Sequence, residues 1–557
     1  MTRRAGARVV ADMLDGYGVT HVFLVPAILR RTMAELERRH PHIERVVTHG
    51  EKAAAYMADG YARVSGRPGV AAAQVVGALN LAAGLREPFL AGSPVIALTG
   101  GRSPATKFRA VYQEVDDLPA FDPVTKLNAT VDDAGRFPDM LRQAFRVATT
   151  GHPGPVHLQI QGNEGQLDTE ETDAEPRVEA TFARVPAVRP APGDDSVREI
   201  LRLLGEAERP VIVAGGGVRA SGAGAELVAL AETLGIPVAT SANGKDTIPG
   251  THPLALGVVG TYSRECANQA VARSDLVLFV GTRTGSMTTH FWAVPPEGTA
   301  AVQIDLEPAH LGLNYPLRAF LAADAKAALS RLAALARPLH KDGWLAETER
   351  LKAEWRDRYR EVLTSDAVPI RPERIAGELT AGLPADAVLV ADTGHAGMWM
   401  AQFHDVTSPG QGYLRSAGHL GWAFSAGVGA KCAAPERPVV VFTGDAGLYY
   451  HLGEIETAVR RRVNLITVVN NNHGGNQSKR GFDRAYGGAP TGKSRELWTY
   501  EDVDFARIAE GMGALGLRVD KPGDLKPALE RALSAGRPAV IDVHTDIEVV
   551  APLPYRP

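Results

Sequence analysis

The chain has 557 residues, which at roughly 150 residues per domain predicts three or four domains. Its 60 Lys and Arg against 64 Asp and Glu leave a net charge of −4, and this near balance excludes a nucleic-acid binder that acts through bulk positive charge. Two cysteines, Cys266 and Cys432, cannot form a disulfide framework in a chain of this length, so a reducing compartment is expected.

The most apolar stretch of the chain, residues 69–85, is interrupted by Gln74, Asn80 and several glycines. It falls short of the ~20 apolar residues that a membrane span needs. We therefore expect no membrane partner and a cytoplasmic location.

Short apolar runs alternate with glycine-containing turns and helical periods along the whole chain. In the N-terminal third, apolar runs predict buried strands and an Ala-rich segment predicts a helix. Alternation of this kind is typical of α/β units built around a buried parallel sheet. The predicted strands are 21–26, 43–48, 69–75 and 94–99, and the predicted helix is 52–64.

Two stretches break this alternation. Residues 162–195 are acidic and then Pro-rich without apolar periodicity, which predicts a linker, and residues 345–363 form a charged helix that suits a second connector. The remaining blocks are residues 1–165, 195–335 and 370–557. The predicted fold is therefore α/β with three domains, each a mainly parallel sheet flanked by helices.

The third block contains the strongest set of polar residues. Residues 438–443 predict a buried strand, 444–447 a tight turn, 450–463 a helix and 465–469 a second strand that runs into the polar segment 470–475. In a right-handed βαβ unit the two strands are parallel and close together. The residues that follow them then meet at the carboxyl edge of the sheet, where open α/β sheets bind ligands.

Asp445, Asn472 and the Gly474 carbonyl would supply three oxygen ligands at this edge. That set is too small for a calcium site but suits Mg²⁺, which retains waters and takes further oxygens from phosphates. The glycines at 444, 447, 474 and 475 would let backbone N–H groups approach a diphosphate. Taken singly, the Gly-Asp pair could be an ordinary β-turn and the Asn run a polar loop.

A Gly-Asp-x sequence followed after a βαβ-length interval by Asn-Asn resembles the thiamine-diphosphate binding motif, here Gly444-Asp445-Ala446 and Asn471-Asn472. The resemblance implies thiamine diphosphate and Mg²⁺ as cofactors, with Asp445, Asn472 and Gly474 as the metal ligands. It also implies that residues around the motif bind the cofactor. These residues are Gly444, Ala446, Gly447, Asn472, Gly474 and Gly475.

The same resemblance requires a glutamate at the end of a strand near residue 50, and Glu51 stands there. A carboxylate beside ring N1′ of the cofactor favours the 4′-imino tautomer, which removes the C2 proton to give a nucleophilic ylid. We expect this catalytic carboxylate to be largely buried, with its pKa raised by desolvation. Alone, Glu51 could equally be a first-turn acid that favours a helix N-terminus.

Further residues match the family, which is the group around acetohydroxyacid synthase, pyruvate oxidase and 2-hydroxyacyl-CoA lyase. By resemblance, Gln113 is a catalytic residue that faces the reacting centre, Leu420 is the apolar wedge between the two cofactor rings, and Gly418 beside it also binds the cofactor. His395 is implied as a cofactor contact near the diphosphate. The three domains become a pyrimidine-binding domain (1–165), a central domain (195–335) and a diphosphate-binding domain (370–557).

The central block contains a G-x-G-x-x-A match at 215–220, but no acidic residue stands about 20 residues later at a strand end. We interpret it as a turn. In related enzymes this domain binds FAD, ADP or neither, and the sequence leaves the choice undecided. Arg283 and Asp305 lie where such a nucleotide would be held.

Some positions depart from the acetohydroxyacid synthase pattern: Ala27, the segment 75–77, and residues 476–482 after the metal-binding asparagines. These positions line the substrate side of the site, so both donor and acceptor substrates stay open. Four histidines are candidates for proton shuttles, although each could be a structural hydrogen-bonding group. They are His49, His419, His451 and His473.

The first hypothesis is a thiamine-diphosphate-dependent carboligase of acetolactate-synthase type that acts on a 2-oxo acid through the ylid and an enamine. The alternative is a 2-hydroxyacyl-CoA lyase or acyl-CoA decarboxylase, for which Lys479 with Arg480 and Lys493 with Arg495 could bind the phosphates. Other hypotheses are a non-catalytic, thiamine-diphosphate-binding regulatory subunit and, more distantly, a nicotinamide dehydrogenase. The resemblance places each cofactor between two subunits, which implies a homodimer or a dimer of dimers, a homotetramer.

Overall fold

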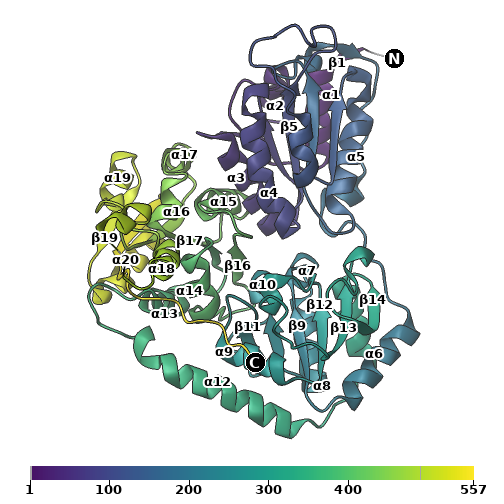
Figure 1. The fold of residues 1–557 in the computed structure, drawn as a ribbon. Coiled ribbons are helices and arrows are strands. Elements are labelled where there is room, and N and C mark those ends of the chain that lie inside the picture. The colour runs from purple at the N-terminus through teal and green to yellow at the C-terminus, as the bar shows by residue number, and fades with distance from the viewer. Residues whose placement is uncertain (1–2, 490) are drawn as a thin grey trace. The chain divides into compact units, whose positions relative to one another are not determined.

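A computed structural model describes residues 3–489 and 491–557 of the protein. The chain forms two compact units that are interleaved in sequence. One unit contains the chain up to Val188 with Ala417–Glu436 and His451–Leu465, and the other contains Arg189–Ser416, Arg437–Tyr450 and Ile466–Pro557. Three parallel sheets of six strands each, flanked by helices, confirm the predicted α/β fold class (Figure 1).

The N-terminal sheet has the strand order β3-β2-β4-β5-β7-β6. Its strands are β2 (His21–Leu24), β3 (Glu44–Val47), β4 (Gly69–Ala73), β5 (Val95–Gly101), β6 (Leu127–Val131) and β7 (Val156–Gln161). Its helices are α1 (Gly6–Gly16), α2 (Arg30–Arg39), α3 (Glu51–Ser65), α4 (Ala78–Ala91) and α5 (Phe137–Thr149). A small antiparallel pair joins β1 (Arg4–Ala5) to β8 (Glu171–Thr172).

Small residues allow α3 to lie close against this sheet. Strand β4 reads Gly-Val-Ala-Ala-Ala and is buried along its whole length. A Cβ on Gly69 would lie 2.0 Å from the backbone oxygen of Ala58 in α3, so a larger residue there would displace the helix. The Ala-rich composition of α3 therefore positions the start of that helix, where Glu51 stands.

The central sheet has a different strand order, β11-β10-β9-β12-β13-β14. Its strands are β9 (Pro210–Ala214), β10 (Val238–Thr240), β11 (Ala255–Val258), β12 (Leu276–Val280), β13 (Ala300–Asp305) and β14 (Leu317–Ala322). Its helices are α6 (Asp194–Glu206), α7 (Gly216–Ala220), α8 (Gly224–Leu234), α9 (Glu265–Arg273), α10 (Ser286–Thr289) and α11 (Ala325–Leu335). The charged connector predicted at 345–363 is the helix α12 (Asp342–Leu363).

The C-terminal sheet has the strand order β16-β15-β17-β18-β20-β19. Its strands are β15 (Val388–Ala391), β16 (Gly412–Arg415), β17 (Val439–Gly444), β18 (Ile466–Asn471), β19 (Leu515–Val519) and β20 (Ala539–His544). Its helices are α13 (Pro372–Gly382), α14 (His395–Phe403), α16 (Asp445–Tyr449), α18 (Asn476–Ala485), α19 (Phe505–Gly511) and α20 (Leu525–Ser534). Two further helices from this part of the chain, α15 (Trp422–Ala433) and α17 (Glu454–Arg460), belong to the first compact unit.

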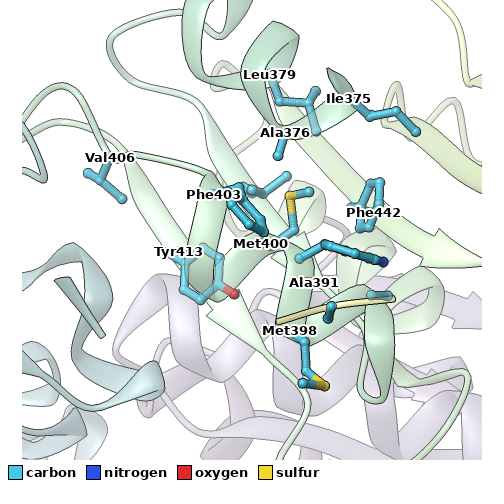
Figure 2. Packing of buried hydrophobic residues seen from close by; sticks show 14 of the residues in the cluster. Ile375, Ala376, Leu379, Ala391, Met398, Met400, Phe403, Val406, Tyr413 and Phe442 are labelled. Atoms are coloured by element: carbon cyan, nitrogen blue, oxygen red, sulfur yellow. The ribbon is translucent and has the colours of Figure 1, made fainter. Parts of the chain in front are cut away.

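The core beside this sheet is made by apolar side chains of α13 and α14 that lie against β15 and β17 (Figure 2). Figure 2 shows Met400 and Phe403 of α14 beside Leu379 of α13 and Phe442 of β17. Trp355 of α12 stacks on Phe403 with ring centroids 5.8 Å apart, so this charged helix also contributes apolar groups to the core. A continuous core of this kind fixes the carboxyl ends of β15 and β17.

Two predicted elements differ from the structure. Residues 444–447 are not a tight turn, because Asp445 begins the short helix α16. The helix predicted at 450–463 is shorter, running from Glu454 to Arg460 after a turn that contains Gly453. An acidic residue in the first turn favours a helix start in both α16 and α17, so one short helix replaces the predicted turn and the predicted helix begins later, at Glu454. Among the described residues, no helix is long and apolar enough to cross a membrane.

Candidate functional site

Adjacent strands bring the two halves of the predicted metal motif together. β17 and β18 pair in parallel, with Gly444 opposite Asn470. Asp445 directly follows β17, and Asn472 directly follows β18. Both side chains therefore stand at the carboxyl edge of the C-terminal sheet, as the sequence predicted. This edge is where parallel α/β sheets bind ligands.

Asp445 is a buried carboxylate, with 3% of its surface exposed. The backbone N–H of Ala446 donates to its Oδ1 at 2.7 Å, and that of Gly474 donates to its Oδ2 at 2.9 Å. Burial nevertheless raises the pKa of Asp445 to about 6, because desolvation outweighs these hydrogen bonds. The site thus favours a positive charge that would compensate the carboxylate.

Asn472 adds a second oxygen that needs a partner. Its Oδ1 is buried and has no hydrogen-bond partner among the described residues. A buried acceptor without a donor is costly unless a cation, a water or a ligand satisfies it. A desolvated carboxylate and an unsatisfied amide oxygen at one sheet edge are hard oxygen donors of the kind that Mg²⁺ takes. The residues present therefore fit the metal that the sequence motif implies.

Glycines keep the backbone close around this edge. A Cβ on Gly447 would lie 2.3 Å from Thr443 Oγ1 and 2.7 Å from Asp392 Oδ2. A Cβ on Gly474 would lie 2.5 Å from the backbone oxygen of Trp498. Both positions accept only glycine without a rearrangement. Ala446 lies beside them as the second residue of α16, and Gly475 precedes α18 and donates its backbone N–H to Trp498 O at 2.7 Å.

His395 begins α14, just after β15, and so stands at the same edge. It is buried, and its Nδ1 has no hydrogen-bond partner in the described part of the chain. Burial, followed by the positive charge of Arg480, lowers the pKa of His395 to about 4. The ring is therefore neutral at pH 7 and has a nitrogen available for a ligand.

Glu51 is the first residue of α3, after β3. Asn80 Nδ2 donates to its Oε2 at 3.1 Å, and a Cβ on Gly77 would lie only 2.2 Å from its Oε1. The expectation that Glu51 is largely buried is not met, because its side chain is partly exposed. Its contacts come from one side, from Gly77 and from Asn80 of α4, and so leave part of the carboxylate open to solvent.

Gln113 lies in an irregular loop and has a φ of 65°, which is uncommon for a residue with a side chain. Gln74, at the carboxyl end of β4, donates from Nε2 to its Oε1 at 3.2 Å. The three residues after Gln74 form a 3-10 turn, η1 (Val75–Gly77), whose last residue contacts Glu51. The structure thus brings Glu51 and Gln113 to one edge of the N-terminal sheet.

The sequence reasoning assigned no role to Gln74 and Asn80, which hold these two side chains. They are the two polar side chains within the otherwise apolar stretch 69–85. A polar residue directly after a buried strand was the available signal, because the carboxyl end of that strand is where a ligand would bind.

Leu420 lies in the loop between β16 and α15, within the same compact unit as Glu51 and Gln113. It is a large apolar side chain with 47% of its surface exposed. Gly418 and Gly421, on either side, have φ values of 154° and 78°. Both glycines have a positive φ, which residues other than glycine rarely adopt. The exposed leucine between them is available to contact a ligand.

The four candidate histidines have distinct surroundings. His49 Nε2 lies 2.8 Å from Glu456 Oε2 on the surface, and His419 Nδ1 lies 2.5 Å from the hydroxyl oxygen of Tyr56. Burial lowers the pKa of His451 to about 4. Burial also lowers the pKa of His473, whose ring centroid is 5.1 Å from that of His544. His49 and His419 therefore have structural partners.

In the central domain, the predicted turn at Gly215 leads into the short helix α7. A Cβ on Gly215 would lie 2.2 Å from the backbone oxygen of Gly281, so the loops after β9 and β12 touch through their backbones. Close packing of two loops explains these glycines without a bound nucleotide.

The described residues contain no group of three or more His, Cys, Asp or Glu side chains arranged to hold a metal ion. This finding does not conflict with the set at Asp445, because two of its three oxygens would come from an amide and a carbonyl.

Comparisons with known proteins identify the family of the chain. Family models of thiamine pyrophosphate enzymes match the chain as the N-terminal TPP binding domain over residues 4–120, the central domain over 197–332 and the C-terminal TPP binding domain over 392–543. The chain therefore belongs to the thiamine pyrophosphate enzyme family.

Within that family the chain is similar to acetolactate synthases and to a glyoxylate carboligase. It is 32% identical to a probable acetolactate synthase large subunit of Methanocaldococcus jannaschii, over 98% of this chain and 93% of that protein. It is 31% identical to acetolactate synthase 1, chloroplastic, of Zea mays, over 97% and 85% of the two chains. It is 30% identical to glyoxylate carboligase of Escherichia coli O157:H7, over 93% and 89%.

Proposed function

We propose that the protein is a thiamine-diphosphate- and Mg²⁺-dependent carboligase of acetolactate-synthase type that acts on a 2-oxo acid. The observation that carries the proposal is the desolvated carboxylate of Asp445 beside the unsatisfied oxygen of Asn472. A desolvated carboxylate and an unsatisfied amide oxygen at the carboxyl edge of β17 and β18 are hard oxygen ligands that suit a metal-bound diphosphate. The names of the similar proteins support the same reaction class.

In this proposal, Asp445, Asn472 and the Gly474 carbonyl hold Mg²⁺. Backbone groups of Gly444, Ala446, Gly447 and Gly475 take the cofactor's diphosphate, with His395 as a further contact. Thiamine diphosphate, when bound, supplies a nucleophilic carbon and accepts the electron pair of the broken carbon–carbon bond. The central domain is assigned no FAD or ADP, because its matching family model names no nucleotide and the glycines at 215 and 281 serve loop packing.

Glu51 would share a proton with the pyrimidine ring of the cofactor and so favour the imino tautomer of that ring. Asn80 orients Oε2 of Glu51 through a hydrogen bond. Gln113, oriented by Gln74, faces the reacting centre, and Leu420 supports the cofactor rings. The presence of Glu51 also argues against a non-catalytic binding subunit, since binding alone does not need that carboxylate. We further propose a homodimer or a dimer of dimers as the active assembly.

The cations of α18 differ in whether an acidic side chain compensates them. Lys479 Nζ lies 2.9 Å from Asp483 Oδ2 and 3.0 Å from Glu548 Oε2, so its charge is already compensated. Arg480 forms no ion pair within the described residues, and its positive charge contributes to the lowered pKa of His395. A guanidinium beside a neutral imidazole can bind the carboxylate of a 2-oxo acid through two parallel hydrogen bonds.

The test is to incubate the purified protein with thiamine diphosphate, Mg²⁺ and pyruvate or glyoxylate and to assay the carboligation product and CO₂. We expect turnover with a 2-oxo acid that stops when Mg²⁺ is chelated. A 2-hydroxyacyl-CoA, assayed in parallel for formyl-CoA, separates the alternative. Formyl-CoA release without turnover of any 2-oxo acid would show the acyl-CoA assignment to be the right one.

A further inference from the structure

The buried carboxylate of Glu87 accepts hydrogen bonds from the loop that carries Leu420. The backbone N–H of Ala417 donates to Glu87 Oε1, and that of His419 donates to Glu87 Oε2 at 3.2 Å. Glu87 belongs to α4 and is fully buried. Its two oxygens thus hold two backbone amides of one loop, which restrains that backbone more than either bond alone.

The charge of Glu87 is compensated by Arg63 of α3. Arg63 Nη2 lies 3.3 Å from Glu87 Oε1 and 2.6 Å from Asp59 Oδ2, and its side chain is 8% exposed. Trp422, the first residue of α15, donates from Nε1 to Asp59 Oδ2 at 2.9 Å. The guanidinium of Arg63 also lies over the Trp422 ring, 4.5 Å from its centroid. Three buried charged groups therefore hold the segment on both sides of Leu420.

The network is not needed to hold α3 against α15. These helices pack through their backbones, since a Cβ on Gly60 would lie 2.0 Å from Ala426 O and a Cβ on Gly429 would lie 1.8 Å from Met57 O. A buried ion network adds little net stability over apolar side chains of similar size. Small residues already supply the packing between α3 and α15. The buried charges therefore indicate a different role, which is to fix the loop.

We propose that Glu87 is a positioning residue that, oriented by Arg63 and Asp59, fixes the loop Ala417–Gly421 so that Leu420 is held against the bound cofactor. The proposal rests on the cofactor role proposed above for Leu420. Leu420 itself is exposed between two glycines, so its own packing does not restrain it. The restraint comes instead from Ala417 and His419 on one side and Trp422 on the other.

The first test is amide hydrogen exchange of the full chain without cofactor, read by mass spectrometry, in wild type and Glu87→Gln. Gln retains the size of the side chain, and Arg63 remains paired with Asp59. We expect the amides of Ala417 and His419 to exchange at least about 10-fold faster, while peptides of α3 and α15 keep their protection. Glu35→Gln, on the surface of the same unit, is the control.

The second test is kinetic and compares Leu420→Ala in the wild-type and Glu87→Gln backgrounds. Glu87→Gln is expected to lower kcat by roughly 10-fold, with the KM of the 2-oxo acid nearly unchanged, because binding groups of the substrate are not altered. If Glu87 acts through Leu420, Leu420→Ala costs less in the variant than in wild type.

Loop amides that exchange as in wild type, or a Leu420→Ala cost that is equal in both backgrounds, would overturn the proposal. If Glu87→Gln folds poorly, the triple variant Asp59→Asn, Arg63→Met and Glu87→Gln removes all three charges and serves the same two measurements. Failure of the proposed function would appear differently, as a wild-type protein that binds no thiamine diphosphate while its loop exchange still responds to Glu87→Gln.

Discussion

The carboxylate of Asp445 is buried with a raised pKa, although two backbone N–H groups donate to it. Replacing it with Asn keeps the size and removes the charge. We expect Mg²⁺ affinity, measured by calorimetry in the presence of thiamine diphosphate, to fall by about 100-fold or more. The melting temperature of the protein without metal should change little, because the cost of burying a carboxylate is removed while one of its two backbone hydrogen bonds is lost. Loss of fold, or unchanged metal affinity, would contradict the assignment.

Asp386→Asn is a matched control for this experiment, because Asp386 is exposed in the same domain. It should change neither quantity.

Glu51 can be tested in the same way. Glu51→Gln retains the hydrogen-bonding shape of the side chain but removes the group that takes a proton. Thiamine diphosphate should still bind, while turnover falls by about 100-fold or more. The measurements are cofactor titration by fluorescence and a steady-state assay. A variant that keeps full activity would show that Glu51 is not the catalytic carboxylate.

Gly77 offers a test of Glu51 placement that leaves the carboxylate intact. In Gly77→Ala the new Cβ would lie 2.2 Å from Glu51 Oε1, so Glu51 must move. We expect kcat to fall by roughly 10- to 100-fold with thermal stability nearly unchanged. Gly343→Ala is the control, because nothing lies within 4 Å of its Cβ. Equal kcat values for the two variants would mean that the position of Glu51 does not matter.

For single residues, the sequence predicts which side chains stand at the ends of strands better than it predicts what surrounds those side chains. Asp445 and Asn472 stand where the pattern of strands placed them, at one edge of the C-terminal sheet, and His395, which the family resemblance implied, follows β15 at the same edge. The burial of Glu51 could not be predicted, because it depends on which elements cover the start of α3. The role of Glu87 could not be predicted either, because the loop amides that it binds lie more than three hundred residues away and a charged residue in a helix is normally exposed.

Among the elements, strand and helix limits follow the apolar pattern closely. The predicted helix at 52–64 is α3, Glu51–Ser65, and the predicted strand at 438–443 is β17, Val439–Gly444. The predicted helix at 450–463 was wrong in its start, because α16 and the turn at Gly453 precede α17. Periodicity reports which residues are buried, but a short interruption within a helical period is decided by local capping and packing.

A buried lysine links two elements of the second unit. Lys245 lies in a 3-10 segment, Ala242–Thr247, and its Nζ donates to Ala401 O of α14 at 3.1 Å. Burial lowers the pKa of Lys245 to about 7. The unfolded chain therefore binds one more proton than the folded chain between about pH 7 and pH 10.5, so stability rises with pH in that window.

We expect this lysine to add about 1.5 kcal/mol to the free energy of unfolding between pH 7 and pH 8.5, relative to Lys245→Met. The measurement is denaturant unfolding at both pH values, where the difference between wild type and variant removes the contribution of other groups. His404, Asp405, Arg264 and Asp246 face the same lysine and are unchanged in the variant. Identical pH slopes for the two proteins would refute the burial of a neutral amine here.

For the whole molecule, the proposed self-association should depend on apolar side chains that the single chain leaves exposed. Leu79 and Val76, beside Gly77, are 49% and 54% exposed. Leu79→Glu should weaken the dimer, so that activity falls as the protein is diluted and light scattering reports a smaller mass. Leu313→Glu, at a 60% exposed position in the central domain, should leave the mass unchanged. A monomeric, fully active wild type would rule out the proposed assembly.

The N-terminal and C-terminal sheets share one strand order, in which the second strand of each lies at the edge and is followed by α3 or α15. Glu51 and Leu420 therefore occupy equivalent places in the two domains. The helices after them meet reciprocally, Gly60 against Ala426 and Gly429 against Met57. Within their compact unit, α3 and α15 thus cross with one close glycine contact contributed by each helix. A larger residue at Gly60 or at Gly429 would force the two helices apart, so either change is expected to shift both the start of α3, with Glu51, and the loop before α15, with Leu420.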